Sequence, residues 1–196
     1  MNRTHDPLQD LSEIREMMER SSKFLSLSGL AGVGAGVAAL TGALLASLRL
    51  GSGDPESPAG FLLLDAGGVL LAALTLSIFF TTRMARKKNL PVWDHTTVHL
   101  LTGLTIPLLV GGASCLLLWY HGFTLIIPSV TLIFYGLALL NTSTRTLNEV
   151  RYLAAAELLL GLLAMGFLNA WLLFWALGFG VLHLVYGIAM YLKYEK

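Results

Sequence analysis

Residues 150–192 read VRYLAAAELLLGLLAMGFLNAWLLFWALGFGVLHLVYGIAMYL, and this stretch decides the fold. It is almost entirely apolar and about twice as long as the roughly 20 residues that a helix needs to cross the hydrocarbon core of a bilayer. Leu168-Asn169-Ala170 interrupts it near its middle. We therefore predict two antiparallel membrane-spanning helices, at 150–168 and 170–192, joined by a tight turn.

Four more apolar runs of similar length precede this hairpin, at 24–48, 60–82, 97–119 and 122–140. Hydrophobic residues make up 55% of the 196 residues and charged residues only 13%, whereas a soluble domain carries about 25% charged residues. So few charges cannot cover a water-soluble surface. The sequence predicts an all-α, polytopic membrane protein, a bundle of six transmembrane helices whose first partner is the lipid bilayer. Nothing in it indicates binding to nucleic acid.

The first 23 residues have a different character. An apolar stripe at helical spacing consists of Leu8, Leu11, Ile14 and Met18. The acids of this segment outnumber its bases, whereas a helix that lies on a membrane surface is normally basic. We expect residues 1–23 to form a cytoplasmic amphipathic helix that docks on protein. The transmembrane domain then covers 24–192, and 193–196 form a cytoplasmic tail.

The lysines and arginines predict the orientation, because cytoplasmic loops of membrane proteins are enriched in them. Of the 13 basic residues, all but Arg49 fall on one side of the predicted topology. They are Arg3, Arg15, Arg20, Lys23, Arg83, Arg86, Lys87, Lys88, Arg145, Arg151, Lys193 and Lys196. We therefore expect an inner-membrane protein with both termini in the cytoplasm.

No motif for nucleotide, metal-protease or disulfide chemistry is present, and Cys115 is the single cysteine. The predicted loops are also too short to fold as a catalytic domain. These features disfavour an enzyme and imply no cofactor, so a functional site is expected inside the bundle. A membrane enzyme or redox protein ranks third among the possible functions, after a scaffold and a transporter.

Glu157 and His183 are the strongest site candidates, because ionisable residues inside spans are costly and usually face the interior of the bundle. The turn at residue 170 places both residues at the same depth of the hairpin. Each is also in a row of small residues, and small residues let membrane helices approach closely. The expected pairs across the hairpin are Ala164 with Ala176, Gly161 with Gly180, and Ala154 with Gly187. Whether the Glu–His pair stabilises the fold or binds a proton or ligand stays open.

Three further polar positions are weaker candidates. Asp65 lies about five residues inside the second span, on a face that we expect to include Gly68 and Ala72, and is a ligand or proton candidate. His95 and His99 are separated by one helical turn, a spacing that can hold a metal ion. Interfacial polar residues with no ligand are the alternative for all three.

The first span is rich in small residues on two sides. Gly32 and Gly36 belong to a Gly-x-x-x-Gly row with Ser28, and a second row contains Ala38, Gly42 and Ala46. Such rows favour close helix packing, either within the bundle or with a membrane-protein partner or second copy.

The run Glu19-Arg20-Ser21-Ser22-Lys23-Phe24-Leu25-Ser26-Leu27-Ser28-Gly29-Leu30 resembles the start of a group of uncharacterised six-helix bacterial membrane proteins. The resemblance covers about the first 45 residues and implies no activity. In helix number and size the chain is also similar to the substrate-binding components of energy-coupling-factor vitamin transporters. That similarity concerns architecture only.

Two functions follow from these features. The acidic N-terminal segment and the small-residue rows of the first span favour a non-enzymatic bundle for sensing, scaffolding or assembly. The alternative is a small-solute or proton-coupled transporter that uses Glu157 and His183. A cavity that reaches Glu157 would favour the transporter, and a closed, dry hairpin would favour the scaffold.

Overall fold

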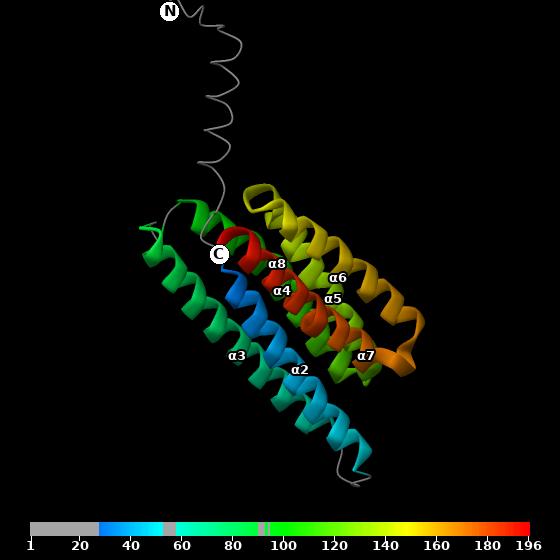
Figure 1. Ribbon diagram of the computed structural model, residues 1–196. Coiled ribbons are helices and arrows are strands. Elements are labelled where there is room, and N and C mark those ends of the chain that lie inside the picture. The colour runs from blue at the N-terminus through cyan, green and yellow to red at the C-terminus, as the bar shows by residue number, and fades with distance from the viewer. Residues whose placement is uncertain (1–27, 53–57, 90–92, 94) are drawn as a thin grey trace, which may run out of the picture.

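The computed structural model describes residues 28–52, 58–89, 93 and 95–196 (Figure 1). Within these residues the chain is helical apart from short connections and contains no strand. The predicted amphipathic helix at 1–23 lies outside the described residues.

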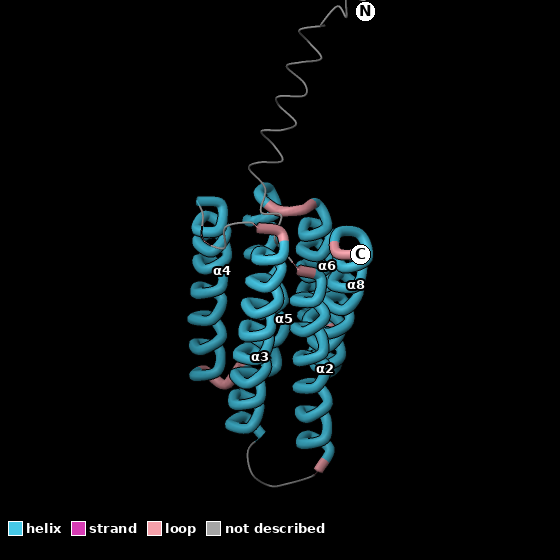
Figure 2. Tube along the Cα trace, turned by 60° about the vertical axis from the view of Figure 1, so that its left-hand side comes forward, coloured by secondary structure: helices cyan, strands magenta, loops and turns pink. Residues whose placement is uncertain are grey.

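Six helical spans run back and forth through the bundle (Figure 2). The first five are α2 (Gly29–Gly51), α3 (Pro58–Lys87), α4 (His95–Tyr120), α5 (Ile127–Thr142) and α6 (Asn148–Gly166). The sixth is continuous but consists of α7 (Trp171–Trp175), the π-helical η4 (Ala176–Leu182) and α8 (His183–Tyr194). Short 3-10 turns are η1 (Thr124–Ile126), η2 (Ser143–Arg145) and η3 (Leu168–Ala170). The predicted all-α, six-helix bundle is confirmed.

Five of these spans are long and apolar enough to cross a membrane. They are Gly29–Gly51, Gly60–Lys87, Thr97–Tyr120, Thr124–Thr142 and Leu168–Tyr194. The span that does not meet this criterion, α6, carries Glu149, Arg151 and Glu157. These charges have a structural use, because Glu157 faces the interior and Glu149 binds the end of α8, as described below.

The helices are arranged around the last span. α2 lies between α3 and α8 (Figure 1), while α6 packs along α5 and against the last span. α3 packs chiefly on α2 and α4 chiefly on α5, although α3 and α4 follow one another in the chain. These two helices therefore form the edges of the bundle, and many of their large apolar side chains are exposed.

Glycines bring α2 into backbone contact with the last span. A Cβ added to Gly36 would lie 2.8 Å from the carbonyl oxygen of Gly180, and one added to Gly32 would lie 3.0 Å from Cα of Gly187. The opposite side of α2 packs on α3, where a Cβ at Gly34 would meet Leu76 at 3.2 Å. The predicted close packing of this span on two sides is confirmed, and both neighbours belong to the same chain.

The predicted glycine pairing between the last two spans is wrong. Gly180 and Gly187 face α2, whereas a Cβ at Gly161 would lie 3.0 Å from the backbone nitrogen of Ile133 in α5. The two small-residue rows therefore serve two different interfaces. The reason is physical: a row of small residues indicates a close approach but does not specify which neighbouring helix makes it.

The fourth span begins later than predicted, at Ile127 instead of residue 122. Pro128, expected inside the fourth span, lies in the first turn of α5, where the missing N–H leaves no hydrogen bond unmade. The turn before it includes Gly122 with a φ of 81°, a conformation that favours glycine. Together with η1, this turn delays the start of α5 to Ile127.

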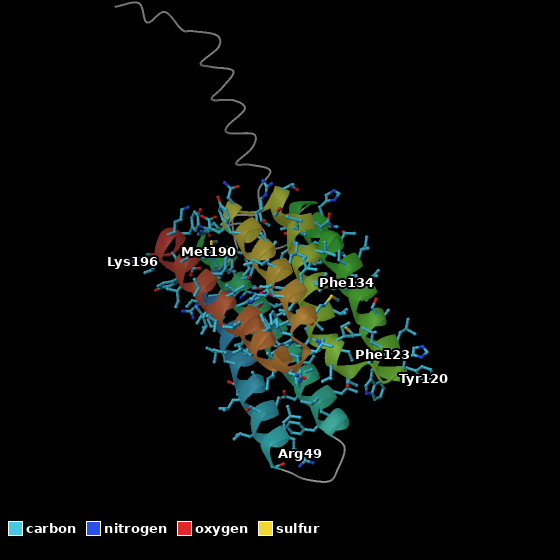
Figure 3. The ribbon with its side chains drawn as sticks, turned by 90° about the vertical axis from the view of Figure 1, so that its right-hand side faces the viewer. Arg49, Tyr120, Phe123, Phe134, Met190 and Lys196 are labelled. Atoms are coloured by element: carbon cyan, nitrogen blue, oxygen red, sulfur yellow. The ribbon has the colours of Figure 1, made fainter. Side chains whose placement is uncertain are left out.

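Basic residues gather at one end of the bundle, which we call the basic end and define by Arg83, Arg86, Lys87, Lys88, Arg151, Lys193 and Lys196. Arg49 lies at the opposite, distal end (Figure 3). At the basic end the amino group of Lys193 is 2.5 Å from Oε1 of Glu149, and the Tyr194 hydroxyl donates to the same oxygen at 3.1 Å. Partial burial of the Glu149 carboxyl opposes its ionisation, but the bonds from Lys193 and Tyr194 outweigh burial and lower its pKa.

Candidate functional site

Glu157 and His183 meet in the middle of the bundle. Glu157 comes from α6 and is fully buried, and His183, the first residue of α8, is 5% exposed. The distance between Glu157 Oε1 and His183 Nδ1 is 3.4 Å. The predicted contact is therefore confirmed, and it follows from the equal depth of the two residues on either side of the turn.

The hydrogen bonds of His183 determine which of its ring nitrogens carries the proton. Nδ1 lies 3.1 Å from the carbonyl oxygen of Gly178, which can only accept, so Nδ1 carries a hydrogen and donates it. Nε2 lies 2.8 Å from the hydroxyl of Tyr135 in α5. In a neutral imidazole Nε2 accepts, so the Tyr135 hydroxyl donates to it. A doubly protonated ring would reverse only this last bond, because a hydroxyl can also accept.

The carboxyl group of Glu157 has a tight apolar enclosure. A Cβ added to Gly178 would lie 2.6 Å from Glu157 Oε2 and would also press on Leu132, a fully buried residue of α5. Gly178 is therefore the gap in η4 that admits the carboxyl group. Neither carboxyl oxygen has a hydrogen-bond partner among the described residues, because the Nδ1 hydrogen points to Gly178.

An unpaired carboxylate in such an enclosure has a high free energy. Burying a polar group without a hydrogen bond costs roughly 2–7 kcal/mol, and an isolated charge costs far more. Two arrangements of hydrogens fit the same atoms: a neutral acid beside a neutral imidazole, or a carboxylate beside an imidazolium. Because Nδ1 already carries a hydrogen, the proton that converts one arrangement into the other leaves Glu157 and is taken up at Nε2, beside Tyr135, and does not cross the 3.4 Å contact between Oε1 and Nδ1.

The π-helical segment shapes this site. Ala176–Leu182 has the wider turn of a π-helix, and the side chain of His183 bonds back to the carbonyl five residues earlier. π-helical turns are rare and are often found at functional sites. Gly178 and Gly180 belong to this segment and are both buried. The site therefore combines a buried acid, a buried imidazole and an irregular backbone.

Aromatic rings separate the Glu157–His183 pair from the distal end. Phe179 lies between Trp175 and Tyr135, with ring centres 5.2 Å from each, and 6.0 Å from the ring of His183. Trp175 in turn lines a cavity at the distal end. Neither Glu157 nor His183 lines this cavity or the smaller one at the basic end, which Ser28, Arg83 and Glu195 help to line.

No protein-family model, curated protein or solved structure matches this chain. The resemblance of its first 45 or so residues to six-helix bacterial membrane proteins therefore stays a prediction. The site has to be interpreted from its own chemistry.

Asp65 does not join this pair. It faces α2, where a Cβ at Gly42 would lie 3.4 Å from its Oδ2, and it lines the distal cavity. Gly68, expected on the same face, has open space beside it, and Ala72 is exposed. The predicted face is wrong by about one position, since Asp65 shares its side of α3 with Val69.

The predicted histidine pair lies in the first turns of α4. The side chain of His95 is outside the described parts of the chain, so the metal prediction for His95 and His99 stays a prediction. Among the described residues, no group of three or more His, Cys, Asp or Glu side chains could hold a metal ion.

Sequence reasoning missed Tyr135 and Gly178. Tyr135 supplies the third polar group of the site from α5, and Gly178 makes room for Glu157. A signal for Gly178 was present, because Gly178 and Gly180 stand five and three residues before His183. No comparable signal singles out Tyr135, because its position relative to His183 depends on how α5 packs.

Proposed function

We propose that the protein spans the cytoplasmic membrane several times, with the basic end in the cytoplasm. The five apolar spans support insertion into a bilayer, and the separation of the basic end from Arg49 supports the orientation. Single cysteines in a Cys115→Ala background test it. An impermeant thiol reagent added to intact cells should label position 54 and spare position 88. Labelling of position 88 would overturn the orientation.

We further propose that Glu157, His183 and Tyr135 form a proton-binding site, the centre of a small proton-coupled carrier. The observation that carries the proposal is the carboxyl group of Glu157, which is fully buried, has no hydrogen-bond partner among the described residues and lies 3.4 Å from His183 Nδ1. A pair that served only to hold two helices together would be expected to satisfy its oxygens. A carboxyl group that takes up and releases a proton instead lacks a hydrogen-bond partner in one of its two protonation states.

The surroundings of the pair support the same function. Tyr135 can donate to His183 or accept from it, so it fits both protonation states without movement of heavy atoms. The π-helical turn supplies a backbone that can rearrange, and Phe179 is the aromatic ring to be displaced if the site is to open toward the distal cavity. Proton binding would thus be linked to a change in the last span.

Infrared titration of the purified, full-length protein tests proton binding directly. We expect a carbonyl band of a protonated carboxylic acid that titrates with pH and is absent in Glu157→Gln. His183→Gln should move the titration midpoint, and Tyr135→Phe should move it less. A spectrum that is the same in the wild-type protein and Glu157→Gln at every pH would refute the proposal.

Proton movement across a membrane tests the carrier. Proteoliposomes with an internal pH indicator and an imposed membrane potential should show proton entry with the wild-type protein and none with Glu157→Gln. A matched variant, Glu149→Gln, removes a carboxyl group at the basic end and should retain entry. Equal entry in all three preparations would exclude a carrier that uses Glu157.

A non-enzymatic scaffold is the second candidate, and one observation favours it: neither cavity reaches Glu157 or His183. The exposed apolar faces of α3 and α4 would then bind a membrane-protein partner or a second copy as well as lipid. If Glu157→Gln and His183→Gln together leave proton entry and the infrared titration unchanged while lowering stability, the scaffold is the better explanation.

A further inference from the structure

A cavity of about 330 Å³ lies at the distal end of the bundle, apart from the Glu157–His183 pair. Six elements build its wall: α2, α3, α4, η1, α5 and α7. The residues that give it chemical character are Asp65, Cys115, Trp119, Thr131, Trp171 and Trp175. The remaining wall is almost wholly aliphatic. This volume is within the range of small-molecule sites, which are mostly apolar with a few polar groups.

Among the described residues of the wall, Asp65 is the only acid and none is a base. Gly42 of α2 lies beside Asp65, with Val69 on the same side of α3, and neither can neutralise a charge. No hydrogen bond or ion pair joins Asp65 to another side chain in the described part of the chain. The carboxylate is half-buried and so keeps access to the cavity. The wall therefore offers one negative charge without a counter-ion.

Three of the four tryptophans of the chain line the same cavity. Trp119 comes from α4, and Trp171 and Trp175 come from α7. The face of an indole ring attracts a cation through the electron density of its π system. A carboxylate and several indole rings in one apolar cavity are complementary to a cation that is itself apolar.

We propose that the distal cavity binds a hydrophobic monovalent cation, such as a quaternary ammonium or phosphonium ion with aromatic or alkyl groups. Its charge lies at Asp65 and its apolar groups lie against Trp119, Trp171 and Trp175. A small, strongly hydrated ion such as an alkali cation does not fit, because the wall has too few oxygens to replace its water. The proposal does not depend on proton binding by Glu157, since neither Glu157 nor His183 lines the cavity.

The arrangement of the helices gives such a ligand a route from the lipid. The wall joins α3 to α4, but each of these helices packs chiefly on a different neighbour. A hydrophobic cation concentrates in the membrane, so an entrance between these edge helices would open where the ligand is most abundant. Substitution of Cys115, on the α4 side of the wall, by a large residue should then obstruct the cavity.

Tetraphenylphosphonium and tetraphenylborate provide a matched pair of probes, because they have the same shape and opposite charge. Equilibrium dialysis of the purified, full-length protein in detergent should give one saturable site for tetraphenylphosphonium. Bound tetraphenylphosphonium should also change the tryptophan fluorescence. Tetraphenylborate should show only the unsaturable partition that empty micelles show.

Variants separate a specific site from partition into micelles. Asp65→Asn should weaken tetraphenylphosphonium binding by about tenfold or more, and Trp119→Leu by about threefold to tenfold. Cys115→Trp keeps Asp65 but fills the cavity, so it should also weaken binding. Glu149→Gln is the control that removes a distant carboxyl group and should bind as the wild type does.

Two results would overturn the proposal. One is equal affinity for tetraphenylphosphonium and tetraphenylborate, which would mean that the cavity accepts any apolar molecule. The other is unchanged binding in folded Asp65→Asn and Cys115→Trp proteins. Because the measurement is of binding and needs no proton movement, its failure would leave the proton site of Glu157 untouched, and the reverse also holds.

Discussion

Gly178→Ala is the smallest change that tests the geometry of the Glu157 enclosure. The added Cβ would lie 2.6 Å from Glu157 Oε2, about 0.8 Å closer than the 3.4 Å at which ordinary contacts begin. The same atom would press on the fully buried Leu132. Either the carboxyl group or the last span must shift.

Two opposing effects determine how Gly178→Ala changes the free energy of unfolding. Inserting a methyl group into a packed core costs about 1–3 kcal/mol, whereas replacing glycine by alanine inside a helix gains about 0.5–1 kcal/mol. We therefore expect Gly178→Ala to destabilise the protein by about 0–2.5 kcal/mol. Gly67→Ala in α3 is the matched control, because its Cβ would meet nothing within 4 Å. It should be neutral or slightly stabilising.

Unfolding in mixed micelles of a mild and a denaturing detergent measures these differences. A double-mutant cycle with Glu157→Ala isolates the contact with Oε2, because that contact disappears when the carboxyl group is removed while the contact with Leu132 remains. We expect Gly178→Ala to cost at least about 1 kcal/mol less in the Glu157→Ala background. If Gly178→Ala is as stabilising as Gly67→Ala and the cycle shows no coupling, the enclosure of Glu157 is described wrongly.

Three further predictions concern packing, charge and a turn. Gly187→Ala should destabilise by about 1–3 kcal/mol, because its Cβ would lie against the backbone nitrogen of Val33 and 2.6 Å from the carbonyl oxygen of Gly29 in α2. Gly112→Ala faces open space and should not destabilise. Detergent unfolding compares the two variants. Glu149→Gln should remove the acid-side pH dependence of the bond to Lys193. Since the pKa of folded Glu149 is lowered, the bond stabilises above the ordinary value of 4.5 and is lost as pH falls through the folded-state pKa. On the alkaline side the pKa of Lys193 is raised by Glu149, so the bond still stabilises the protein at pH 10.5 and is lost above it. Thermal unfolding at several pH values checks both effects. For Glu149→Gln we expect the bond's contribution to the fall of Tm at acid pH to be absent. Gly122→Ala should cost about 1 kcal/mol through its positive φ, visible as a lower Tm, and an unchanged Tm would contradict the strain.

The sequence predicts the number of spans and the depth of the buried pair for a simple physical reason. Bilayer thickness fixes the length of each span, and a tight turn at residue 170 then fixes which residues of two antiparallel helices lie at equal depth. Glu157 and His183 are therefore predictable as neighbours. Their contact needs only the helix rise and the knowledge that polar side chains face inward.

Which helices share a small-residue interface could not be predicted in the same way. The rows containing Gly161 and Gly180 have the right spacing to face each other, yet Gly161 packs on α5 and Gly180 on α2. Periodicity assigns a residue to a face of its own helix and says nothing of the neighbour that covers that face. Tyr135 was missed for the same reason, since its place beside His183 is a result of how three helices pack.

The π-helical segment was also not predictable from periodicity. A helix of regular pitch through Ala176–Leu182 would carry the same apolar pattern over seven residues, so the wider turn leaves almost no trace in the sequence. Its local cause is visible only in three dimensions. Gly178 leaves room for the carboxyl group of Glu157, and Nδ1 of His183 donates to the carbonyl oxygen of Gly178.

The contact of α2 with α8 can form only late in the synthesis of the chain. Gly29 and Glu195, which meet across this interface, are separated by 166 positions in the chain. At a synthesis rate of about 5–20 residues per second, the glycine-lined side of α2 has no permanent neighbour for roughly 10–30 s. During that interval the glycine-lined side of α2 is an exposed helix-packing surface in the membrane, to which a second nascent copy can bind. A chain that stops before α7 would keep that surface bare, and such fragments should associate with one another where the complete chain does not.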